Sequence, residues 1–205
     1  MIALKSQRQL KTTGLLAEIA RRVADGVGLL SQLLGTPSSE RAAQREELLS
    51  LEGQVMDLHF NLMTQIRSVF LTPLPREDIY MLSQQLNRVM EHVTAAGDLI
   101  ITRKNLQLPS SCASQVETLS RQAELTVAAM SVLDDFDHLE EYWVQVQRLA
   151  KQANRTHRDW VTSTDTAFQP NIALQQTEIA EQILAAVHAQ RSVAVTCGAI
   201  IVRES

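Results

Sequence analysis

Apolar residues recur at steps of three and four along most of the chain. One clear run passes through Ile79, Leu82, Leu86, Val89 and Val93. This spacing puts apolar side chains on one face of an α-helix, where they can pack against other helices. The same pattern predicts six helices, at about 9–34, 38–70, 75–105, 114–133, from a junction at 134–141 to 160, and 170–201. The expected fold class is therefore all-α, a bundle of six long antiparallel helices.

Glycine, proline and acidic residues mark the corners between these helices. We expect the corners near Gly35, Pro73, Pro109, Asp135 and Phe168. Three prolines suit the first position of a helix, where the missing proline N–H costs nothing: Pro37, Pro75 and Pro170. Thr36 is predicted to cap the second helix. Ser114 and Glu117 have the spacing of a capping box for the fourth helix.

The length permits one large domain or two small ones, and the composition favours long helices. Of the 205 residues, 45% are hydrophobic but only 4% are aromatic, so aliphatic side chains must fill the core. The sequence Pro109-Ser110-Ser111 breaks the chain near its midpoint and leaves three predicted helices on each side. We expect one domain over residues 1–205.

Charge and cysteine content argue against several protein classes. The net charge is −4 and no run of Lys and Arg occurs, which excludes an ordinary nucleic-acid footprint. The two cysteines, Cys112 and Cys197, form no C-x-x-C motif and predict reduced cytosolic thiols. Cys197 lies on the apolar stripe predicted for the sixth helix, together with Leu174 and Ile179. Cys112 is near a predicted helix start, where either a reactive thiolate or an inert thiol would fit.

The sequence also predicts that the protein stays out of the membrane. The N-terminal residues lack the pattern of a signal peptide. The longest apolar run, residues 193–202, is much shorter than the roughly 20 residues that cross a bilayer. We therefore expect a cytoplasmic protein.

The corner between the second and third helices resembles a known family signature. The sequence F-L-T-P-L-P-R-E-D-I, followed by L-x-x-x-L-x-x-V, is similar to that of the PhoU-like phosphate transport regulators. The resemblance implies a cytoplasmic all-helical protein built from two three-helix units, here about 1–107 and 108–205. The signature residues in this chain are Thr72, Pro73, Arg76, Glu77 and Asp78.

The resemblance also implies where metal-binding acids would lie, as E-x-x-x-D pairs one helical turn apart. In the second helix this pair falls on Glu52 and Met56, and in the third helix only Glu91 is acidic. His188 is the one potential ligand at the corresponding positions of the sixth helix. Residues other than metal ligands occupy the remaining positions: Asn87, Arg88, Ala150, Asn154, Leu184 and Arg191. Because arginine repels a dication, we predict no metal cluster and no cofactor, with Glu52, Glu91 and His188 as residual candidates.

No pattern in the sequence indicates catalysis. The chain has no G-x-S-x-G, Walker loop, H-E-x-x-H or G-x-G-x-x-G motif. His138 stands among Asp134, Asp135, Asp137 and Glu140, which is more typical of a solvated helix start than of a metal site. We expect that the protein is not an enzyme.

The function implied by the resemblance is regulatory or accessory, in inorganic phosphate transport. The protein would act through protein–protein contact, with a membrane phosphate permease as the partner, contacted peripherally. The corner Thr72–Asp78 is the candidate contact, although its charges would equally serve to hold the corner together. Two alternatives stay open: a metal-binding PhoU-like protein, or a helical scaffold module with no phosphate role. Homo-oligomerisation is also left open.

Overall fold

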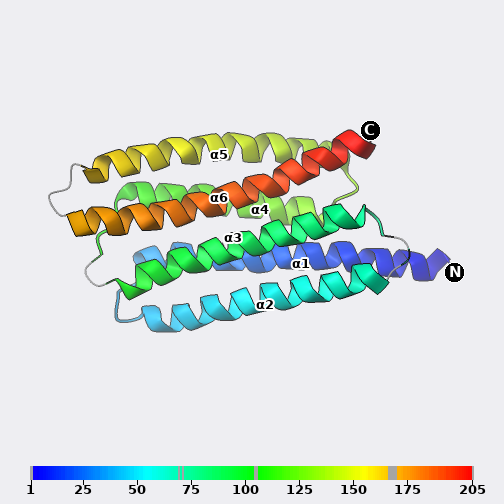
Figure 1. Ribbon diagram of the computed structural model, residues 1–205, viewed down its shortest axis with the longest axis horizontal. Coiled ribbons are helices and arrows are strands. Elements are labelled where there is room, and N and C mark those ends of the chain that lie inside the picture. Colours follow the sequence, from blue (N-terminus) through cyan, green and yellow to red (C-terminus); the bar gives the residue numbers. More distant parts are fainter. Residues whose placement is uncertain (1, 69, 71, 104–105, 166–169, 205) are drawn as a thin grey trace.

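The described residues of the chain form six long α-helices (Figure 1). The computed structural model describes all residues except 1, 69, 71, 104–105, 166–169 and 205. Side chains are described from Thr12 onward, with the exception of Asp165. No strand occurs in these ranges. The predicted all-α fold is confirmed. The helices are α1 (Ile2–Gly35), α2 (Arg41–Ser68), α3 (Arg76–Thr102), α4 (Ser110–Ser131), α5 (Phe136–Asp165) and α6 (Pro170–Glu204).

The helices form two units of three that pack side by side. In the first unit α1, α2 and α3 contact one another, and in the second α4, α5 and α6 do. The units meet where α1 packs on α4 and α3 packs on α6. Consecutive helices run in opposite directions, and α2 and α5 lie at opposite edges of the bundle (Figure 1). One continuous apolar core extends through both units.

The apolar stripes of the sequence form this core. All five residues of the Ile79–Val93 run are buried on α3, as predicted. Trp160 and Tyr142, both on α5, are the largest of the fully buried side chains. Cys197 is buried in the core, as expected. Leu174 is an exception to the predicted stripe, because it is exposed near the start of α6.

Two predicted helix starts are wrong. Thr36 does not cap α2, because its hydroxyl donates to the Gln32 carbonyl at 2.9 Å and so completes the end of α1. The second helix begins only at Arg41, after a turn that includes Pro37. The fourth helix begins at Ser110, so Ser114 lies inside α4 and cannot form a capping box.

The other predicted corners agree with the structure where it describes them. Pro170 is the first residue of α6. Pro75 occupies the cap position immediately before α3, one residue earlier than the helix itself. At the start of α5, the Asp135 carboxylate accepts a hydrogen bond from the His138 backbone N–H at 3.1 Å. The corner predicted at Phe168 lies outside the described residues.

The α6 helix is more apolar than the sequence analysis recognised. By length and composition alone it could cross a membrane, with a mean hydropathy of 1.3 over its most apolar window. In this fold α6 instead packs against α3, α4 and α5, and 44% of that window is buried. Burial against these helices therefore accounts for part of the apolar character of α6, while Val195 and Val202 stay exposed.

Candidate functional site

The corner between α2 and α3 is held by a buried carboxylate. Asp78, in the first turn of α3, is only 5% exposed and forms an ion pair with Arg203 near the end of α6. The Thr72 hydroxyl donates to the Leu74 carbonyl at 2.7 Å, which fixes the loop before the helix. The backbone N–H of Asp78 donates to the Pro75 carbonyl at 3.0 Å. Asp78 therefore anchors the corner, one of the two roles that the sequence left open.

Two charged side chains of the corner remain on the surface. Arg76 and Glu77 are both exposed at the start of α3. Next to them, Pro73 and Leu74 line a cavity that also includes Leu133 and other residues from the α4–α5 connection. The corner therefore lies where the ends of the two units meet, and its outer charges are accessible to another molecule.

Sequence reasoning missed Arg203, the partner of Asp78. The two residues are 125 positions apart in the chain, and nothing in their local sequences connects them. The only signal is a basic residue in the last turn of α6, where cations are favoured by the helix dipole.

The two residual acidic candidates do lie close together, on the face between α2 and α3. Burial raises the pKa of Glu52, and the negative charges of Glu91 and Asp98 raise this pKa further. Asn87 donates to the Glu91 carboxylate at 2.7 Å, while Arg45 pairs with Asp98 at 2.8 Å. This face therefore carries three acids, Glu52, Glu91 and Asp98. The Asn87 amide already donates to Glu91, and the Arg45 guanidinium already pairs with Asp98.

We expect Glu52→Gln to stabilise the fold at neutral pH. The pKa of Glu52 is higher in the folded than in the unfolded chain, so the charged carboxylate opposes folding at pH values above both pKa values. The stabilisation should shrink as the pH falls through the raised pKa, because the folded chain then takes up a proton on Glu52, and it should vanish below the unfolded-state pKa, where both states are protonated. Urea unfolding at pH 7 and pH 4 measures this difference, with the exposed Glu117→Gln as control. A loss of stability at pH 7 would instead indicate that the Glu52 carboxylate is held by a cation.

His188 lies elsewhere, on the face between α5 and α6. Its Nε2 is 3.3 Å from Asn154 Oδ1, and the neighbouring Arg191 donates to Gln147 at 2.7 Å. Desolvation of the ring lowers the pKa of His188, and the positive charge of Arg191 lowers this pKa further. The charges that act on His188 are those of Arg191 and His157, whereas Glu52 is influenced by Glu91 and Asp98, so the histidine and the two acids belong to different clusters.

Within the described part of the chain, no three His, Cys, Asp or Glu side chains gather in a way that could hold a metal ion. The absence of a multinuclear cluster stays a prediction, and elemental analysis of the purified protein is its test. We expect no tightly held metal beyond trace amounts. Two or more ions per chain would show that ligands other than Glu52, Glu91 and His188 have been overlooked.

The cysteines offer no reactive site. Both thiols are buried, and burial raises the pKa of Cys112 and of Cys197 to about 12. At neutral pH each is a protonated thiol, so the thiolate alternative for Cys112 is not supported.

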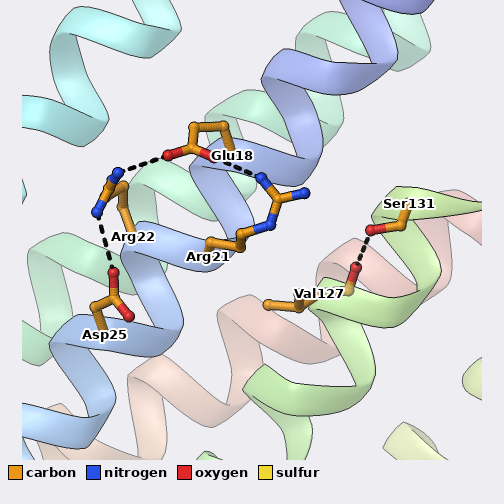
Figure 2. A network of polar contacts seen from close by, with 6 residues as sticks. All are labelled: Glu18, Arg21, Arg22, Asp25, Val127 and Ser131. Atoms are coloured by element: carbon orange, nitrogen blue, oxygen red, sulfur yellow. Dashed lines mark hydrogen bonds and ion pairs between the residues drawn. The ribbon is translucent and has the colours of Figure 1, made fainter.

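A charged network on α1 is the main polar cluster outside these faces. Arg22 pairs with Glu18 at 2.7 Å and with Asp25 at 3.3 Å, and Arg21 pairs with Glu18 from the other side (Figure 2). The hydrogen bond from Arg21 lowers the pKa of Glu18. All the ion pairs join residues one turn apart at the surface, where each contributes about 0.3–0.5 kcal/mol. The network stabilises α1 and leaves its charges mutually satisfied.

A buried polar layer, which no pattern in the sequence predicted, crosses the second unit. The Thr126 hydroxyl oxygen of α4 is 3.0 Å from the Tyr142 hydroxyl oxygen of α5. The same Thr126 hydroxyl donates to Gln190 Oε1 of α6 at 2.7 Å. Gln122 donates to the Val146 carbonyl at 3.4 Å. These groups link three helices through hydrogen bonds inside the core, which fixes their relative positions.

Comparison with known proteins identifies the fold. No protein-family model and no curated protein matches the sequence. Among solved structures, a PhoU-like protein from Shewanella oneidensis MR-1 superposes with a TM-score of 0.68 at 13% identity, covering 93% of this chain and 96% of that one. The chain shares its fold with PhoU-like proteins. A second Shewanella oneidensis MR-1 protein, a candidate PhoU-like phosphate regulatory protein, has a TM-score of 0.66 at 13% identity and covers 94% of this chain and 99% of that one.

Proposed function

We propose that this protein is a non-enzymatic regulator or accessory protein of inorganic phosphate transport. The observation that carries the proposal is the PhoU-like fold over almost the whole chain, with 93% of its length covered. The second neighbour is itself described in terms of phosphate regulation.

The proposed mode of action is contact with another protein in the cytoplasm. The partner is a membrane phosphate permease, which the bundle contacts peripherally from the inner side. We place the contact at the α2–α3 corner, because Arg76 and Glu77 are exposed there beside Asp78, which pairs with Arg203. A corner held by the ion pair of the buried Asp78 presents its outer charges in a fixed arrangement, as a binding loop requires.

The double substitution Arg76→Ala with Glu77→Ala tests this contact. We expect an unchanged melting temperature together with lost binding to the permease in a pull-down from membranes. The matched control is Arg121→Ala with Glu124→Ala, which removes another exposed Arg and Glu, paired at 2.8 Å on α4. If the corner variant melts earlier and still binds, the two charges only stabilise the corner. If the wild-type protein retains no permease, the phosphate role is wrong and a helical scaffold role is left.

A further inference from the structure

The outer face of α2, a helix at the edge of the bundle, carries three exposed large apolar side chains among its polar residues. Leu49, Met56 and Phe60 are 36%, 49% and 60% exposed. Their spacings of seven and four residues place them on one face of the helix. The opposite side of α2 packs only against α1 and α3, so no described helix covers this outer face. We call the exposed face from Glu46 to Arg67 the α2 seam.

The edge helix of the other unit does not share this property. Exposed positions of α5 are mostly charged or amide side chains, with Trp143 as the main apolar exception. The two edge helices have equivalent places in their units, at opposite sides of the bundle (Figure 1). Position at the edge of the bundle therefore does not explain the exposed apolar residues of α2. Contact with a partner surface would explain them.

The residue order along the α2 seam specifies what that partner is. Glu46 stands near the N-terminal end and Arg67 in the last turn, with the apolar residues between them. A second copy of α2, packed antiparallel with its two-fold axis between Met56 and Asp57, places each Glu46 opposite Arg67 of the other copy. A parallel arrangement would place like charges together.

The same register provides space for the largest side chain. It puts Phe60 of one copy opposite Gly53 of the other, and no atom lies within 4 Å of where a Cβ of Gly53 would be. The open space above Gly53 of each copy can therefore accept the Phe60 ring of the other copy, which gives two equivalent contacts across the two-fold axis. The Glu46–Arg67 pairs at the two ends and the space at Gly53 favour this self-complementary arrangement, while the exposed Asp57 of each copy lies beside the axis and opposes it.

We propose that α2 is a homodimerisation helix, packing antiparallel against α2 of a second copy through Leu49, Met56 and Phe60. The α2 seam is about 32 Å long at 1.5 Å per residue. One helix pair of this length lies at the small end of specific interfaces. We therefore expect a dimer that dissociates at about micromolar concentration. This inference is independent of the proposed phosphate role.

Sedimentation equilibrium across a wide concentration range measures the dimer. We expect Phe60→Glu to weaken dimerisation by 100-fold or more, or about 3 kcal/mol. The matched control is Leu174→Glu on α6, because Leu174 is also 60% exposed but lies outside the α2 seam. The control should dimerise like the wild type. Circular dichroism confirms that both variants are folded, as expected for surface substitutions.

Two further variants test the register. Glu46→Arg alone and Arg67→Glu alone should each weaken the dimer, and the double variant should restore it because the opposite charges are exchanged. Met56→Cys should form a disulfide-linked dimer on mild oxidation, since Cys112 and Cys197 are buried. A wild-type protein that stays monomeric at high concentration would overturn the proposal. A dimer that tolerates Phe60→Glu, or a double variant no better than the singles, would also overturn it.

Discussion

Replacing Trp160 with alanine is expected to lower the free energy of unfolding by about 3–5 kcal/mol. Trp160 is fully buried on α5 and is the largest side chain in the core. The substitution removes its transfer free energy and leaves a cavity that the surrounding long helices cannot fill by collapsing. Urea unfolding followed by circular dichroism gives the change in the free energy of unfolding.

The other tryptophan provides the control for this prediction. Trp143 lies on the same helix but is 39% exposed, resting against Gly198 of α6. Trp143→Ala should therefore cost clearly less than Trp160→Ala. Equal losses for the two substitutions would contradict the assignment of Trp160 to the core.

Replacing Leu86 with alanine is the second substitution with a large expected effect. Leu86 is fully buried on α3, which packs against α1 and α2 within its own unit and against α6 of the other. Its truncation should lower the free energy of unfolding by about 2–5 kcal/mol. Leu174→Ala, at an exposed position, should change the free energy of unfolding little. A loss below 1 kcal/mol for Leu86→Ala would be inconsistent with the described packing.

Together these two substitutions test whether the chain is one domain. Leu86 belongs to the first unit and Trp160 to the second, and the core is continuous between the units. Both variants should therefore shift one cooperative transition. If each variant affects only one of two separate transitions, residues 1–107 and 108–205 are independent domains.

The helices were predictable because their stripes repeat for many turns. The run from Ile79 to Val93 predicts both a helix and its buried face, and the structure confirms both. Helix ends were harder to predict. The Thr36 hydroxyl can cap the start of one helix or donate to a carbonyl at the end of the previous one, and the sequence does not distinguish the two. Leu174 was assigned to the core by period alone, but the first turns of α6 extend beyond full burial.

The candidate site was predictable only where the chemistry is local. The corner Thr72–Asp78 could be found from its prolines and first-turn acids. Its tie to Arg203 depends on the packing of α6 against α3, which no local pattern encodes. The α2 seam was not predicted, because the buried residues of α2 already account for its helical period. Leu49, Met56 and Phe60 form a second apolar stripe on another side of the same helix.

The most direct test of the proposed role in phosphate transport is uptake of labelled inorganic phosphate after deletion of the gene for this chain. We predict that cells without the protein lose normal control of uptake when phosphate changes from scarce to abundant. Wild-type protein should restore control, and the variant with Arg76→Ala and Glu77→Ala should not, although it folds. If uptake and its control are unchanged in the deletion strain, the protein is not a regulator of phosphate transport.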